Sequence, residues 1–206
     1  MKQPGQEDAK AAGTPNPHTE GSSAALRMGM RLFLASLAVL FAAGVVGYLV
    51  IRGNSGSALP PGSIELPAGL WASTAVLLVS GLTTRAALGG LRRGSADDLR
   101  RWLSSTWVLG AVFMAIQAPC MVDLLRSHEV ALEQKNASIY GIAAALILIH
   151  ALHVIGGMVP LSWLTLQALR HGLDRVRIPS LQLWTNYWHF LEVVWIILLA
   201  LFLITS

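Results

Sequence analysis

The chain has 206 residues, of which 54% are hydrophobic and only 13% are charged. Soluble domains carry roughly 25% charged residues, so this composition predicts an integral membrane protein. The net charge of +4 does not indicate nucleic-acid binding, because the basic residues flank apolar stretches instead of forming one patch. The single cysteine, Cys120, excludes an internal disulfide and a cysteine metal cluster, and its role is left open.

Residues 1–27 are polar and rich in proline, glycine, alanine and serine, which predicts a disordered amino-terminal tail before one membrane domain at residues 28–206. A bilayer core about 30 Å thick is crossed by roughly 20 helical residues. Five stretches are long enough and carry no charge except Glu192: Leu32–Ile51, Leu66–Thr84, Trp102–Val122, Asn136–Leu169 and Ile178–Ser206. They lack the period-two alternation of membrane strands and predict an all-α bundle of five transmembrane helices.

The connecting segments carry turn and cap signals. Gly53–Pro67 is rich in proline and glycine, which predicts a tight connection without a domain of its own. Ser95 precedes Ala96, Asp97 and Asp98, an order typical of an N-cap residue followed by an acidic first helical turn. The third helix is therefore expected to begin directly after Ser95.

The positive charges are distributed unevenly between the two sides of the predicted bundle. With five crossings, the amino-terminal tail and the second and fourth loops share one side. That side holds 12 lysines and arginines, whereas the other side holds 3, namely Arg52, Arg126 and Lys135. The positive-inside rule therefore predicts that the amino terminus is inside and the carboxyl terminus outside.

Four ionisable residues lie within the apolar stretches, and they are the candidate site residues: His150, His153, His189 and Glu192. A charged side chain at the bilayer centre costs roughly 2.5–3.5 kcal/mol on insertion scales, so such residues usually have a partner or a task. We favour a structural interpretation, with polar contacts between helices. His153, His189 and Glu192 are expected to form the buried polar part of the contact between the fourth and fifth helices.

Haem or metal ligation is the alternative interpretation of these residues. His150 and His153 lie on one helix face, so a bis-histidine haem would need His189 as the second axial ligand. Counting from a common membrane boundary places His153 and His189 roughly 12 Å apart in depth, at 1.5 Å per residue. A metal held by His150, His153 and Glu192 would have a poor ligand set. We therefore predict no catalytic residue, haem ligand or metal ligand in this chain.

Two motifs stand out in the last two stretches: HALHVIG, from His150 to Gly156, and YWHFLEVVW, from Tyr187 to Trp195, which includes Trp188. Weaker motifs stand in a fixed order before them: RLFLAS at residues 31–36, LPPG at 59–62, RRG at 92–94 and Gln117-Ala118. Together they resemble subunit III of haem-copper respiratory oxidases, the cytochrome c oxidase subunit III family. The resemblance covers about residues 28–206.

This resemblance implies a divergent five-helix subunit III in a bacterial plasma (inner) membrane, packed beside oxidase subunits I and II. The complex would reduce oxygen with electrons from cytochrome c or quinol and contribute to proton translocation. Haem and copper are expected in the partner catalytic subunit and not in this chain. The chain itself is expected to stabilise that partner and to support its proton uptake.

The chain also departs from the family pattern. Leu37 stands where the family commonly has a buried glutamate, which leaves open whether proton uptake is affected. Pro119 and Cys120 follow Gln117-Ala118, where the family often has an aromatic residue and a glutamate. Two helices that form one wall of a lipid-holding cleft in seven-helix members are absent. A bound phospholipid is therefore expected only where a partner supplies that wall.

Three other functions are compatible with a chain of this kind. The first is a subunit III-like partner of a nitric oxide reductase. The second is a small membrane electron carrier with its own b-type haem, and the third is an assembly factor without a lasting partner. The absorption spectrum of the purified chain and the identity of copurifying subunits distinguish these functions.

Overall fold

The chain forms a bundle of long α-helices in a computed structural model that describes residues 17–54, 68–131, 137–174 and 176–205. The helices are α1 (Pro17–Asn54), α2 (Ala68–Arg92), α3 (Ala96–Ala131), α4 (Ala137–His171) and α5 (Ile178–Thr205). No strand occurs in these ranges. The predicted all-α bundle of five helices is therefore confirmed.

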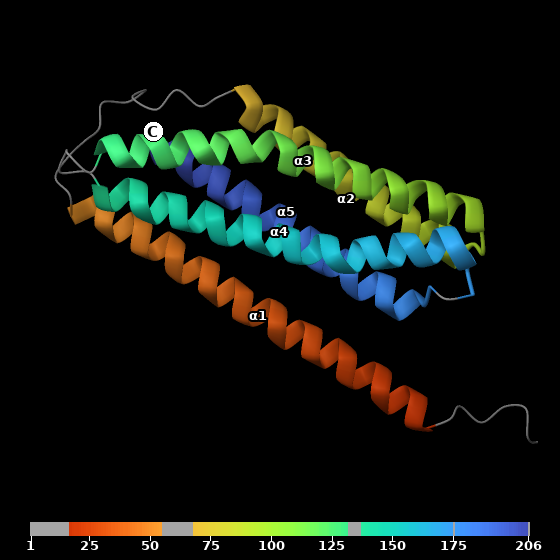
Figure 1. The fold of residues 1–206 in the computed structure, drawn as a ribbon. Helices are drawn as coiled ribbons and strands as arrows, with labels where there is room; N and C mark the ends of the chain where they lie inside the picture. Colours follow the sequence, from red (N-terminus) through yellow and green to blue (C-terminus); the bar gives the residue numbers. More distant parts are fainter. Residues whose placement is uncertain (1–16, 55–67, 132–136, 175, 206) are drawn as a thin grey trace, which may run out of the picture.

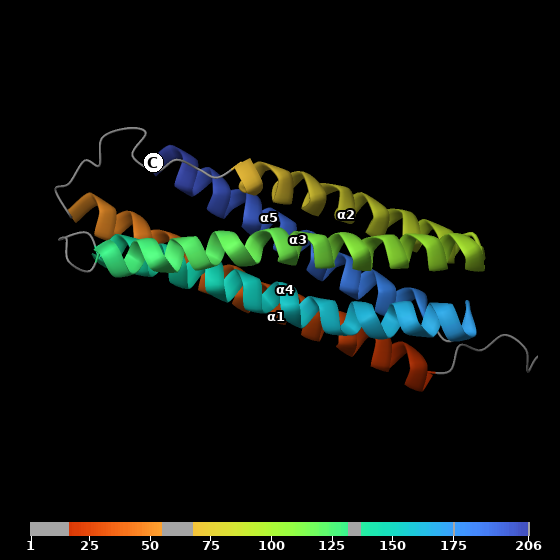
Figure 2. The same ribbon diagram turned by 45° about the horizontal axis from the view of Figure 1, so that its top comes forward.

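The helices lie lengthwise beside one another, and successive helices run in opposite directions (Figures 1 and 2). α2 packs against α3, and α3 packs against α4. α4 and α5 also pack against each other and against α1, and α5 packs against α2, so each of these two helices contacts three others. The first residue of α1 and the last residue of α5 lie at opposite ends of the bundle, as five crossings require.

Four helices are long and apolar enough to cross a membrane: α1, α2, α4 and α5. α3 is as long as α4 and lies beside it over the same length of the bundle (Figure 1). Its apolar part is interrupted by Ser104, Ser105, Thr106 and Gln117, which lower its hydropathy. These polar side chains are at least partly buried between helices, so they do not all face lipid.

The beginning of α1 differs from the sequence prediction. α1 starts at Pro17, so residues 17–27 are helical and do not belong to a disordered tail. Proline suits the first helical position because its missing N–H has no helical partner there, and alanines 24 and 25 extend the helix at little cost. Residues 1–16 and most of the predicted Gly53–Pro67 connection lie outside the described residues.

We call the end of the bundle where α2 and α4 end the basic end. The turn between α2 and α3 lies there and is held by capping hydrogen bonds on both helices. Gly94 has a φ of 72°, which favours glycine, and its N–H donates to the carbonyl of Leu91 while that of Ser95 donates to Gly90. This pattern is the Schellman motif. The Ser95 hydroxyl accepts from the N–H of Asp98 at 3.3 Å, so the predicted N-cap is confirmed.

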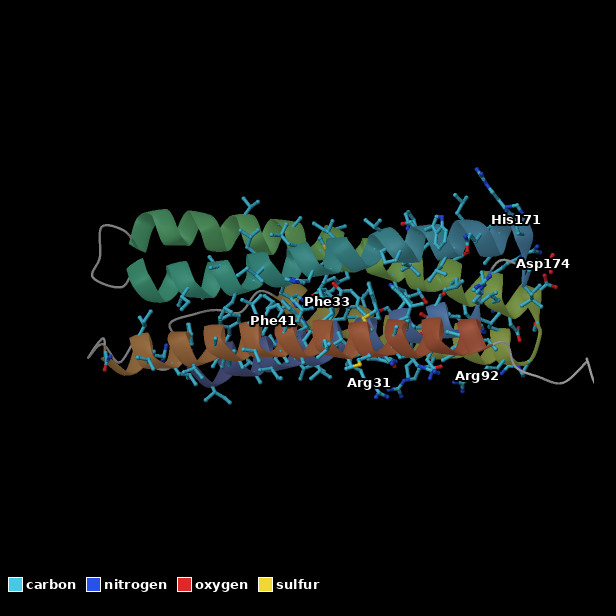
Figure 3. All side chains as sticks on the ribbon, turned by 90° about the horizontal axis from the view of Figure 1, so that it is seen from below. Arg31, Phe33, Phe41, Arg92, His171 and Asp174 are labelled. Carbon is cyan, nitrogen blue, oxygen red and sulfur yellow. The ribbon has the colours of Figure 1, made fainter. Side chains whose placement is uncertain are left out.

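Charged side chains also close this end. Arg93 donates to the carboxylate of Asp98 at 3.0 Å, and this contact holds the pKa of Asp98 below its usual value. Arg100 donates to the carbonyl of Ala168 at 2.9 Å, which satisfies a carbonyl in the last turn of α4. Figure 3 shows Arg92, His171 and Asp174 toward this same end of the bundle.

Candidate functional site

The interior face of α5 binds the neighbouring helices through its tryptophans. The indole N–H of Trp188 donates to the hydroxyl of Ser80 at 2.9 Å, and that of Trp195 donates to Thr74 at 3.0 Å. Both acceptors lie on α2. Trp188 and Trp195 are each only 1% exposed, so both indole rings lie in the interior of the bundle.

The other side of α5 is bonded to α4. The indole N–H of Trp184 donates to the carbonyl of Gly157 at 3.0 Å, and the hydroxyl of Tyr187 donates to the carbonyl of His153 at 2.7 Å. A Cβ on Gly157 would contact the Tyr187 ring, so this glycine allows α5 to approach α4 closely. The YWHFLEVVW motif thus forms hydrogen bonds to α2 through Trp188 and Trp195 and to α4 through Tyr187.

Replacing Trp188 by phenylalanine is expected to lower the free energy of unfolding by about 1–2 kcal/mol, because the hydroxyl of Ser80 loses a donor and part of the ring volume is left unfilled. Thermal aggregation of the detergent-solubilised protein measures this loss. Trp163→Phe is the matched control, since Trp163 is 60% exposed on the outer face of α4. Equal losses in the two variants would contradict the connecting role of Trp188.

A chain of polar contacts joins α2 to α5 in the half of the bundle nearer the basic end. Arg85 on α2 donates through Nε to Nε2 of His189 at 3.0 Å. Nδ1 of His189 then lies 2.7 Å from Oε2 of Glu192 on the same helix. We call these three residues the Arg–His–Glu relay.

The geometry sets the protonation pattern of the relay. An arginine only donates, so Nε2 of His189 must accept, and its ring proton is on Nδ1, from which it donates to Glu192. The imidazole is then neutral, and the positive charge of Arg85 balances the negative charge of Glu192. The Glu192 side chain is 10% exposed, and a carboxylate buried to this degree needs such compensation.

Gly81 makes room for the carboxylate. A Cβ at position 81 would collide with both carboxylate oxygens of Glu192. Oε1 of Glu192 is buried against this part of α2 and has no hydrogen-bond partner among the described residues. The carboxylate of Glu192 can therefore lie against α2 only because position 81, one turn before Arg85, has no side chain.

Sequence reasoning missed Arg85 because it placed this residue in a loop. The uncharged stretch ends at Thr84, but α2 continues to Arg92, so Arg85 projects from a helix at the depth of His189. The signal that could have found it is the run Arg85–Leu88, which contains strong helix formers and neither glycine nor proline, so the helix is expected to continue past Arg85. The i, i+3 pairing of His189 with Glu192 is, by contrast, visible in the sequence.

The structure does not bring His153 to this pair. Its Nδ1 lies 2.7 Å from the carbonyl of Ile149 in its own helix, and its ring packs edge-on against Phe41 of α1. Tyr187 reaches the carbonyl of His153, so the two histidines do not differ in depth by the predicted 12 Å. They are kept apart because His153 faces α1 whereas His189 faces α2.

His150 lies deeper in the bundle and is 1% exposed. Its ring stacks on Trp195 with 5.4 Å between centroids and meets the edge of Phe41 at 6.1 Å. Leu37 is buried one turn before Phe41. Gly44 and Gly47 face Leu146 and Ile142, and continuing this pairing along α1 and α4 places Leu37 level with His153.

The remaining candidate positions add no reactive cluster to these contacts. Among the described residues, no group of three or more His, Cys, Asp or Glu side chains is arranged to hold a metal ion. Gln117 is 5% exposed within α3. Cys120 also belongs to α3, but its side chain lies outside the described part of the chain. What the arrangement does chemically is to balance charge and to hold helices together.

An apolar groove opens where α1 diverges from the bundle. Figure 1 shows the first half of α1 farthest from the other helices. The groove has a volume of about 600 Å³ and is lined by Ala25, Leu26, Gly29, Met30 and Phe33 of α1 and Leu183 of α5. Figure 3 shows Phe33 and Phe41 between α1 and the other helices. α1 is therefore the helix least covered by its own chain.

Comparison with known proteins gives the family. Residues 6–205 match the family described as cytochrome c oxidase subunit III. The chain belongs to this family. Subunit III relatives include the probable cytochrome c oxidase subunit 3 of Nocardia farcinica, which is 28% identical over 197 residues that cover 92% of this chain and 96% of that protein.

Two further relatives carry different names. Cytochrome c oxidase subunit 3 of Bacillus subtilis is 29% identical over 170 residues, which cover 82% of this chain and 81% of the relative. Cytochrome bo(3) ubiquinol oxidase subunit 3 of Pseudomonas aeruginosa is 28% identical over 193 residues, which cover 92% and 89%. This chain is thus a subunit III of a haem-copper oxidase and a multi-pass protein of the bacterial plasma membrane.

Proposed function

We propose that this subunit III is a non-catalytic partner that packs beside subunits I and II, stabilises the catalytic subunit and supports its proton uptake. The observation that carries the proposal is a family match over nearly the whole chain, combined with polar interior groups that tie α5 to its neighbours. Haem and copper belong to the partner catalytic subunit in this proposal. The electron donor is cytochrome c or quinol, since relatives named for either are similar to this chain.

The exposure of α1 supports packing against a partner. Only 17% of the most apolar part of α1 is buried within the chain, compared with 44% for α2 and for α5. Exposed apolar residues continue along this helix at Leu32, Val39, Val46 and Leu49. Some of this surface faces lipid. The apolar groove beside Phe33 binds an acyl chain of a phospholipid in this proposal, and a partner subunit covers the open side of the groove.

The position of the relay supports the link to proton uptake. Arg85 is exposed and His189 is 22% exposed, so the relay connects the surface of the bundle with the buried carboxylate of Glu192. With Leu37 in place of the family's glutamate, Glu192 is the acidic residue that the described spans retain in their interior. The relay lies on the side of the membrane where positive loops indicate the cytoplasm.

Removing this chain from the complex is the test of the proposed role. Membranes from a strain that lacks it should contain an oxidase with unchanged haem per catalytic subunit, lower thermal stability and slower proton uptake. Re-expression of the wild-type chain is the control and should restore both properties. An oxidase with unaltered stability and proton uptake in the absence of the chain would refute the proposal.

The proposed orientation has its own test. Asn54 and Asp97 are exposed at opposite ends of the bundle, and the Asp97 side chain is 98% exposed. In a Cys120→Ala background, a membrane-impermeant maleimide should label Asn54→Cys in intact cells and Asp97→Cys only after permeabilisation. The reverse pattern would show that the amino terminus is outside.

A further inference from the structure

Two buried polar side chains near the centre of the bundle have hydrogen-bonding atoms without partners. Both ring nitrogens of His150 lack a hydrogen-bond partner among the described residues, and so does Oε1 of Gln117. His150 is 1% exposed and Gln117 is 5% exposed. Buried polar atoms are rarely left unsatisfied, so a group that meets their needs is expected between them.

The neighbours of His150 are apolar or already engaged. Trp195 covers one face of the imidazole, and Phe41 approaches it edge-on. The indole N–H of Trp195 donates to Thr74 and is therefore not available to His150. The ring is held in place by these contacts, while its two nitrogens are left for a different partner.

The packing of α3 on α4 places Gln117 at the same level as His150. Trp107 donates to Ser162, and a Cβ on Gly110 would meet Met158, which fixes the pairing of the two helices. Seven residues beyond Gly110 is Gln117, and seven residues before Met158 is Ala151, the neighbour of His150. The two polar side chains therefore lie in one layer of the bundle on adjoining helices.

Trp195 provides a second link between these helices. Its ring touches Phe113 of α3 at 5.7 Å between centroids and His150 of α4 at 5.4 Å. Gln117 follows Phe113 by one helical turn and shares its face. Gln117 therefore lies one helical turn from the Phe113 ring that meets Trp195, and His150 stacks on the same tryptophan.

We infer that Gln117 and His150 bind a water molecule between them in the interior of the bundle. No hydrogen bond joins Oε1 of Gln117 to either ring nitrogen of His150, because all three atoms lack a partner among the described residues. A water molecule can donate one hydrogen to Oε1 and form its other bond to a ring nitrogen, so it bridges the two side chains. Buried waters typically make about three hydrogen bonds to otherwise unsatisfied groups, and such sites are polar, as this one is.

A structure of the purified complex at a resolution that places ordered waters tests the site. The expected result is density for one water within about 3.2 Å of Oε1 of Gln117 and of a ring nitrogen of His150. A direct bond between the two side chains, a third side chain that satisfies both, or an apolar contact without water would each overturn the inference.

Paired substitutions give a second test. Gln117→Met and His150→Phe should each lower the melting temperature, because each leaves one partner of the water unsatisfied. The double variant should regain most of that loss, since removing both polar partners together is nearly neutral. Losses that simply add in the double variant would contradict a shared water.

The matched control uses another buried group with no partner. Oγ1 of Thr165 also lacks a hydrogen-bond partner among the described residues, but it lies on α4 four turns nearer the basic end than His150. Thr165→Val combined with Gln117→Met should show additive shifts in melting temperature. Recovery in this pair equal to that with His150→Phe would show that the coupling is not specific to the proposed water.

Discussion

Gly81→Ala is expected to weaken the contact between α2 and α5 more than any other single methyl group added to the described spans. The new Cβ would collide with the carboxylate of Glu192, which is already fixed by His189 and buried at 8% exposure. Either α5 shifts away from α2 or the relay breaks. Overpacking of this kind typically costs about 1–3 kcal/mol, and loss of the relay adds to that cost.

Retention of subunit III in the solubilised complex, together with its melting temperature, measures this effect. Gly156→Ala is the matched control, because a Cβ there meets nothing within 4 Å and alanine favours the helix. The double variant Gly81→Ala, Glu192→Ala should recover part of the loss, since the colliding carboxylate is gone. A Gly81→Ala protein as stable as the Gly156→Ala protein would show that α5 does not pack here as described.

Glu192→Ala is expected to destabilise the bundle without changing the haem content of the complex. The substitution removes the carboxylate that balances Arg85, and it leaves Nδ1 of His189 without its acceptor. Breaking a buried charge pair costs up to about 3–5 kcal/mol, but Arg85 is exposed, so solvent screening should reduce this to roughly 1–3 kcal/mol. The melting temperature and the haem-to-protein ratio are measured on the same preparation.

Two further variants separate charge from shape. Asp97→Ala removes an exposed carboxylate that lies 3.7 Å from Arg100 and should change the stability by less than about 0.5 kcal/mol. Replacing Arg85, His189 and Glu192 together by methionine or leucine should be milder than Glu192→Ala, because no unpaired charge remains. Loss of a haem band in Glu192→Ala would contradict the proposal that haem is bound by the partner subunit and not through this residue.

Much of the architecture could be predicted because the membrane imposes it. The apolar stretches Leu66–Thr84 and Ile178–Ser206 correctly located α2 and α5, since any helix that crosses hydrocarbon must be apolar for about 20 residues. The residues at which helices end were harder to predict, because capping interactions and not the end of an apolar stretch determine them. α2 continues past Arg85 until Gly94 allows the chain to reverse.

The partners of buried side chains could be predicted only where they are local. His189 and Glu192 are three residues apart on one helix, so their contact follows from the helical repeat. The contact of Arg85 with His189 joins residues 104 positions apart and depends on which faces of α2 and α5 meet. The sequence likewise does not show which helix the His153 face of α4 packs against. His153 was therefore expected beside Glu192 but contacts Phe41 of α1.

The most direct measurement is purification of the tagged chain from native membranes, followed by an absorption spectrum and identification of the copurifying subunits. We expect a stoichiometric complex with a large haem-containing subunit. We also expect that the chain expressed alone shows no Soret band. A chain that purifies without a partner and carries its own haem would contradict the assignment as a non-catalytic subunit III.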